Sequence, residues 1–155
     1  MTHFKTKLVT FLLLISACFI AWADDKTDVE NAYNTWCNTI SSAKTAGPIV
    51  QLYAPDATLL PTLSSKILKN TNGGLNGYFN KLVSNKDFKC TPQTLMTNVY
   101  GDIAVNSGFY DFSYKVASDG GTKLIPSRFT FVYQKYSNGK WMIVTHHSSV
   151  VPRGN

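Results

Sequence analysis

The sequence predicts an α+β fold in which three helices cover one face of a four-stranded antiparallel sheet. The stretch up to residue 83 shows apolar residues at helical spacing together with helix-capping signals. From Thr94 onward, apolar and polar residues alternate in four runs that tight-turn sequences separate. Helices that precede such a meander bury their apolar sides most simply against the sheet, which gives a single α+β domain.

The first predicted helix begins at a capping box and ends at Gly47-Pro48. In Thr27-Asp28-Val29-Glu30, the threonine side chain accepts a hydrogen bond from an amide three residues on, and the glutamate reaches back. Apolar residues then recur on one side of the helix: Val29, Ala32, Tyr33, Trp36, Cys37, Ile40 and Ala43. This apolar stripe predicts that the helix lies on the sheet.

Two further helices and a corner strand are expected next. A short second helix covers Pro48 to Tyr53, with proline in its first turn. A strand follows at Ala57 to Pro61, and the segment from Lys66 to Lys69 is a candidate to pair with it. Thr71 caps a third helix, whose inward side chains are Leu75, Tyr78, Phe79, Leu82 and Val83.

The last hairpin defines a register. If Asn138-Gly139 is a two-residue turn, Tyr136 pairs with Trp141, Phe131 with His146, and Arg128 with Ser149. The face expected to meet the helices carries Phe129, Phe131, Tyr133, Met142, Val144, His146, Ser148 and Val150. The opposite, outer face carries Arg128, Thr130, Val132, Gln134, Trp141, Ile143, Thr145, His147 and Ser149. Because that outer face mixes polar and large apolar residues, it indicates a protein–protein contact.

The adjacent residues His146 and His147 point to opposite faces of the last strand. Such neighbours are poorly placed to bind one metal ion, and no third ligand lies at a suitable spacing, so we expect no metal and no cofactor. Ser148 follows His146 on the same strand without a nucleophile-elbow motif, which argues against a Ser-His-Asp triad. His146 is either a hydrogen-bonded core histidine or the polar end of an aromatic pocket for a small molecule.

Two sets of candidate site residues follow. The candidate ligand pocket comprises Tyr33, Trp36, Tyr110, Phe129, Phe131, Tyr133, His146 and Ser148. Within it, His146 and Tyr110 are the only candidate catalytic residues, and the direction in which the strand of Tyr110 faces is left open. The candidate oligomer interface comprises Arg128, Thr130, Val132, Trp141, Ile143, His147 and Ser149.

The N-terminus has the layout of a secretory signal peptide. Lys5 and Lys7 precede the apolar run from Leu8 to Ala23, which ends in a small-x-small pattern. The run is shorter than the roughly 20 residues that span a bilayer, so we expect cleavage after Ala23. The predicted product is a periplasmic or secreted single domain of residues 24–155. A lipid anchor at Cys18 is the less favoured alternative, because apolar rather than polar residues follow that cysteine.

The expected mature chain has 13 basic and 9 acidic residues, since the leader holds two of the 15 basic ones. Its lysines are scattered, which does not indicate a nucleic-acid groove. Cys37 and Cys90 are the cysteines that remain after the leader is removed. In an exported protein they are candidates for a disulfide, although two buried thiols would satisfy the sequence equally well.

The order of elements and several motifs resemble the nuclear transport factor 2-like superfamily over nearly the whole expected mature chain. "LYAPDATLLP" (52–61) is similar to the helix-to-strand corner of SnoaL-like cyclases and ketosteroid isomerases. "SRFTFVYQKYSNGKWMIVTHHSSVVP" (127–152) most resembles the association (hub) domain of calcium/calmodulin-dependent protein kinase II and its stand-alone bacterial relatives. The resemblance implies a cone in which a curved sheet wraps around the first helix, and dimers or larger assemblies that form through the outer sheet face.

Departures from these relatives limit the functions that the resemblance implies. The hub domain lines its pocket with arginines, but Phe131 and Ser148 stand at those positions, which puts the binding of an acidic ligand in doubt. The isomerases place a catalytic aspartate where Leu59-Leu60 stands here. The sequence therefore favours a self-associating module without catalysis that holds a small apolar ligand. The alternatives are a cyclase-like or isomerase-like enzyme that uses His146, and a module whose outer face binds a different protein.

Overall fold

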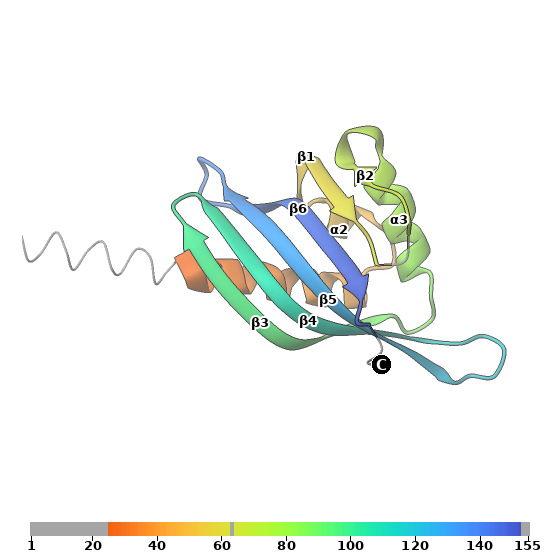
Figure 1. The fold of residues 1–155 in the computed structure, drawn as a ribbon. Helices are drawn as coiled ribbons and strands as arrows, with labels where there is room; N and C mark the ends of the chain where they lie inside the picture. Colours follow the sequence, from red (N-terminus) through yellow and green to blue (C-terminus); the bar gives the residue numbers. More distant parts are fainter. Residues whose placement is uncertain (1–24, 63, 153–155) are drawn as a thin grey trace, which may run out of the picture.

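The computed structural model describes residues 25–62 and 64–152, in which three helices pack against a single curved six-stranded sheet (Figure 1). The N-terminal helix covers residues 25–42 of the described chain. It is followed by α2 (Gly47–Val50), β1 (Tyr53–Leu60), β2 (Leu68–Lys69), the 3₁₀ turn η1 (Asn70–Asn72), α3 (Gly74–Val83), β3 (Lys89–Tyr100), β4 (Ile103–Lys115), β5 (Thr122–Lys135) and β6 (Trp141–Val150). The α+β prediction is confirmed. The predicted leader and Cys18 lie outside the described residues.

The sheet has the strand order β2-β1-β6-β5-β4-β3. The predicted antiparallel meander corresponds to β3–β6, and the hairpin of β4 and β5 extends beyond the body of the sheet (Figure 1). The corner strand β1 begins at Tyr53, earlier than expected, and pairs in parallel with β6, so that Leu59 lies opposite His146. Among the described helices, none is both long and apolar enough to cross a membrane.

The N-terminal helix packs its predicted apolar stripe into the concave side of the sheet. Val29, Tyr33, Trp36 and Ile40 are all buried there. A disulfide joins Cys37 of this helix to Cys90 of β3, with the two Cα atoms 5.4 Å apart. Ser41 strengthens this junction, because its hydroxyl donates to the Cys37 carbonyl at 2.7 Å and accepts from the Cys90 amide at 2.9 Å. The C-terminal half of the helix is thereby fixed to the first residues of β3.

A bulge in β6 overturns part of the predicted register. Phe131 pairs with His146 and Arg128 with Ser149, as expected. Between Val132 and Tyr133 the register shifts by one residue, so that Trp141 lies opposite Lys135 rather than Tyr136. Because a one-residue shift turns each side chain to the other face, the predicted positions of Trp141 and Ile143 on the outer face are wrong. Both side chains are buried on the helix side of the sheet.

A second irregularity lies in β3, between Pro92 and Thr94, beside Gly108 of β4. A Cβ atom at Gly108 would lie 1.9 Å from the carbonyl oxygen of Thr94, so only glycine fits there. Bulges of this kind increase the local twist of a strand pair and bend it. The two irregularities therefore contribute to the curvature that lets the sheet wrap around the N-terminal helix.

Candidate functional site

His146 lies at the centre of the interior, on β6 between β1 and β5. The side chain is only 3% exposed. Its ring stacks on Phe131 with the centroids 3.9 Å apart, and the Trp36 ring meets it edge-on at 5.2 Å. Alternation along β6 turns Ser148 to the same side, where it is also buried. The strand register thus places two polar side chains inside an aromatic shell.

A chain of hydrogen bonds runs through His146 and involves both nitrogen atoms of its ring. The Trp36 indole donates to the Tyr53 hydroxyl at 3.0 Å, and that hydroxyl lies 2.8 Å from Nδ1 of His146. Since an indole N–H can only donate, the Tyr53 proton is free to be donated to Nδ1. Donation from Tyr53 corresponds to the tautomer of neutral His146 whose ring proton is on Nε2, which faces the Tyr110 hydroxyl at 3.5 Å.

The chain continues from Tyr110 toward the edge of the interior. The Tyr110 hydroxyl donates to Oγ of Ser148 at 2.6 Å, and Ser148 in turn contacts the hydroxyl of Thr62, which is half-buried. We call Trp36, Tyr53, Tyr110, His146, Ser148 and Thr62 the His146 cluster. Its members come from the N-terminal helix, β1, β4, β6 and the segment after β1, so the cluster joins both layers of the fold.

Burial controls the protonation of the cluster. It lowers the pKa of His146 to about 3, with a smaller contribution from the neighbouring His147. Burial also raises the pKa of Tyr53 and of Tyr110 above the ordinary tyrosine range. All three side chains are therefore neutral at physiological pH. A histidine with so low a pKa is a weak general base near neutrality, because an efficient base has a pKa close to the working pH.

The space beside His146 is very small. The internal cavity has a volume of about 10 Å³ and is bordered by Trp36, Tyr110, His146 and Ser148, among others. Such a space is about the size of one water molecule. The other predicted pocket residues, Tyr33, Phe129, Phe131 and Tyr133, are buried and fill the interior as packed aromatic rings. Binding of a ligand inside the cone stays a prediction that would require these side chains to move.

Two members of the cluster were missed in the sequence. Tyr53 was predicted at the end of a helix, and Thr62 was not among the predicted site residues. Tyr53 points inward because β1 begins there and pairs with β6, a contact between segments about 90 residues apart that no local pattern reveals. The open question of Tyr110 is resolved, since its side chain faces inward and is fully buried.

Asp111, which follows Tyr110 in the sequence, does not belong to the His146 cluster. Asp111 faces away from Tyr110 and Phe112 on β4, and it accepts a hydrogen bond from the Gln93 side chain at 2.9 Å. Leu59 occupies the buried position on β1 opposite His146. The described part of the cluster therefore consists of neutral groups that hydrogen-bond to one another.

The outer sheet face is the second candidate site. It is the side of β3–β6 that faces away from the N-terminal helix. Its members include predicted residues, namely Arg128, Thr130, Val132, His147 and Ser149, and further residues that are apolar, namely Met96, Ile103, Val105 and Phe109. Phe109 lies opposite Arg128 and is 45% exposed. The Arg128 guanidinium donates to Ser149 at 3.0 Å, which holds it along the face.

Comparison with known proteins assigns this arrangement to a family. The family model of the calcium/calmodulin-dependent protein kinase II association domain matches residues 25–152. The chain belongs to this association-domain family. A family member of known structure from Xanthomonas campestris is 30% identical, with a TM-score of 0.72 over 81% of this chain and 87% of that one. Among functionally curated proteins, none matches this association-domain chain.

More distant structures share the fold of the association-domain chain. A nuclear transport factor 2-like superfamily protein from Salmonella enterica has 17% identity and a TM-score of 0.72, covering 86% of this chain and 95% of that one. A ketosteroid isomerase-like protein from Erwinia carotovora has 12% identity and a TM-score of 0.68, covering 83% and 98%. At these identities the likeness shows the fold alone. The resemblance inferred from the sequence is confirmed at the level of family and fold.

Proposed function

We propose that this protein is an exported, stand-alone association domain that assembles with copies of itself through its outer sheet face and carries out no catalysis. The observation that carries the proposal is the set of exposed apolar side chains on that face. Phe109 and Ile103 remain exposed on a broad surface of regular strands. Met96 lies beside them on β3.

The composition of the outer face supports a protein partner. Large apolar side chains alternate there with Arg128, Thr130 and His147, which are able to hydrogen-bond. Interfaces between proteins commonly combine an apolar centre with arginine and a polar rim. Because β4, β5 and β6 each have a paired strand on both sides, their side chains rather than their backbone are available for contact.

The interior of the fold supports a catalytic function less well than the outer sheet face supports self-association. An enzyme of the cyclase or isomerase kind needs room for its substrate next to a base with a suitable pKa. Beside His146 there is space for one water molecule, and the histidine accepts its hydrogen bond from Tyr53. The His146 cluster is better explained as a polar network that stabilises the core.

The disulfide supports the exported location. Bonds of this kind persist in oxidising compartments and are rare in the cytosol. Cys37 and Cys90 are joined, while the leader that would direct export precedes the described residues. Detection of a mature chain that begins at residue 24, by mass spectrometry of periplasmic and culture fractions, tests this part of the proposal.

Light scattering coupled to size-exclusion chromatography tests self-association. The wild-type protein should elute as a dimer or larger species, and Phe109→Lys should weaken association about 30-fold by removing about 2 kcal/mol from the centre of the interface. Asn38→Lys is the matched control, because it adds the same charge at an exposed position of the N-terminal helix. A wild-type monomer at tens of micromolar would refute self-association and leave the outer face to a different partner.

A further inference from the structure

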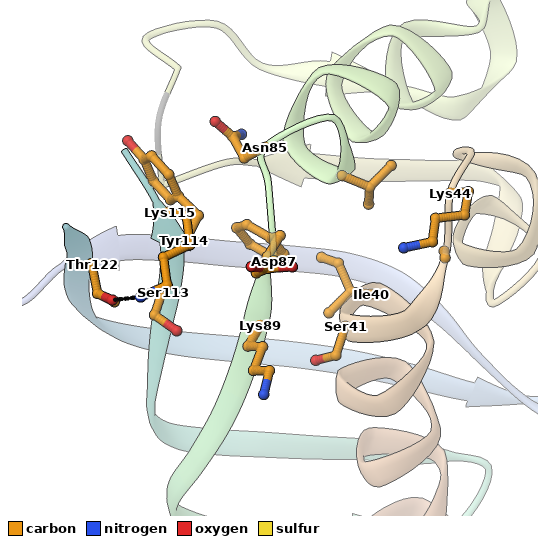
Figure 2. A pocket seen from close by; sticks show the side chains of 13 residues that line it. Ile40, Ser41, Lys44, Asn85, Asp87, Lys89, Ser113, Tyr114, Lys115 and Thr122 are labelled. Carbon is orange, nitrogen blue, oxygen red and sulfur yellow. Dashed lines mark hydrogen bonds between the residues drawn. The ribbon is translucent and has the colours of Figure 1, made fainter. Parts of the chain in front are cut away.

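A groove of about 440 Å³ lies at the C-terminal end of the N-terminal helix, away from both sites described above. Figure 2 shows its side chains, which come from the end of that helix, the loop between α3 and β3, and the base of the β4–β5 hairpin. It is lined by Ile40, Ser41, Ala43, Lys44, Val83, Asn85, Asp87, Phe88, Lys89, Ser113, Tyr114, Lys115 and Thr122. We call it the lysine groove.

The charge of the groove is unbalanced. Lys44, Lys89 and Lys115 supply three positive charges from three separate segments of the chain, and Asp87 supplies one negative charge. Figure 2 shows Lys44 on one side, and Lys115 with Thr122 on the other. Within the described ranges, the ion pairs are Lys26–Glu30 and Lys135–Asp25, so none of the three groove lysines lies within 4 Å of a carboxylate.

The groove also has an apolar floor and a rigid frame. Ile40 and Phe88 are buried beneath it. The disulfide between Cys37 and Cys90 and the hydrogen bonds of Ser41 hold the helix end against β3. On the opposite side, the Lys115 amide donates to the Lys86 carbonyl at 2.8 Å. A ligand would therefore meet a largely preformed site, which reduces the entropic cost of binding.

The Lys115 ammonium group keeps N–H donors that its hydrogen bond to Thr122 does not use. Nζ of Lys115 donates to the Thr122 hydroxyl at 2.9 Å, which uses one of its three protons. Asp87 has a φ of 55°, in the left-handed region that aspartate tolerates better than most residues. Replacing it by asparagine keeps that backbone conformation and removes the single negative charge.

We propose that the lysine groove binds a small organic anion, with its acid group held by the lysines and its apolar body on Ile40 and Phe88. The volume lies in the range of small-molecule sites, roughly 300 to 1,000 Å³. Ile40 borders both this groove and the small internal cavity, and the described linings of the two spaces have no other residue in common. The site is thus distinct from the interior of the cone and independent of the proposed self-association. The shared chemistry is an anionic oxygen, from either a carboxylate or a phosphate.

Fluorine NMR of the intact mature protein tests the site. The probe is 4-(trifluoromethyl)benzoate, and the uncharged control is 4-(trifluoromethyl)benzamide, which has the same shape. We expect saturable broadening of the benzoate signal and at least about fivefold weaker binding of the amide, as for the loss of one close charge pair near a surface. Displacement by inorganic phosphate would assign a phosphate-type ligand, and saturable benzoate binding that phosphate leaves unchanged would assign a carboxylate.

Variants that should weaken benzoate binding, together with one that should strengthen it, make the test specific. Lys44→Gln and Lys89→Gln should each weaken benzoate binding about fivefold, whereas Asp87→Asn should strengthen it by a similar factor. Lys140→Gln, at the β5–β6 turn, is the matched control and should change nothing. The proposal is overturned by equal binding of benzoate and benzamide, by an absence of saturation up to about 10 mM, or by lysine variants that bind like the wild type. Light scattering on the same samples measures their oligomeric state, so a change in benzoate binding can be distinguished from a change in self-association.

Discussion

The His146 cluster and the lysine groove both include residues of the N-terminal helix, but the polar groups of the cluster are buried and neutral, whereas the lysines of the groove are exposed and charged. Trp36 lies on the buried side of the N-terminal helix, and its indole donates into a chain of neutral hydroxyl and imidazole groups. Lys44 lies two turns later, beyond the end of the helix, and keeps its charge in solvent without an acidic partner among the described residues. The comparison indicates that a buried polar residue can stabilise the fold, whereas an exposed charge without an ionic partner remains available to bind a ligand.

The disulfide lies next to both regions in the chain, because Cys37 follows Trp36 and Cys90 follows Lys89, and its removal should have the largest effect. Closing a loop of 53 residues stabilises the folded state by about 4 kcal/mol in the chain-entropy description. We expect the double variant Cys37→Ala/Cys90→Ala to lose about this much unfolding free energy in urea titrations. The loss should be accompanied by weaker benzoate binding, because the helix end is no longer fixed to β3. A loss below about 1 kcal/mol would show that the frame does not depend on the bond.

Removing the Tyr53 hydroxyl should have the next largest effect. Tyr53→Phe leaves both the Trp36 indole and Nδ1 of His146 buried without their partner. Unsatisfied buried groups cost about 1–3 kcal/mol each, so we expect a loss of about 3 kcal/mol in urea unfolding. Tyr100→Phe, whose side chain is exposed, is the matched control. If the two variants were equally stable, the cluster would have no structural role and the contrast with the groove would fail.

A pH series sharpens the same comparison with a smaller effect. Burial lowers the pKa of His146 in the folded protein to about 3, whereas the imidazole in the unfolded chain has its ordinary pKa of about 6.5. The stability that this histidine contributes is therefore complete above pH 6.5 and is lost as the pH falls from 6.5 toward 3. At pH 5 the loss is about 2 kcal/mol.

Two measurements check this pH dependence. The imidazole resonances of His146 should not titrate between about pH 8 and pH 5 in the folded protein. The exposed His147 provides the control, since His147→Gln should leave most of the loss of unfolding free energy in place. Titration of His146 near its ordinary pKa would mean that the interior is open to water and able to admit a ligand.

The sequence predicted the class of fold and much of the interior. The stripe from Val29 to Ile40 identified the buried side of the first helix, and alternation along the last strand placed His146 and Ser148 inside. It did not locate the bulge that turns Trp141 and Ile143 inward, because an added residue in one strand depends on how the curved sheet closes on the helix. It also did not identify the lysine groove, whose charges come from segments far apart in the chain.

The sequence alone therefore determined the fold class, the apolar sides of the main helices and strands, and the family to which the chain belongs. The apolar sides follow from local periodicity, which acts over a few residues. The tertiary structure decided that Cys37 meets Cys90, that Tyr53 meets His146, and that three lysines gather in one groove. Each of these contacts joins segments that are distant in sequence, and their distances become short only when the sheet bends around the N-terminal helix.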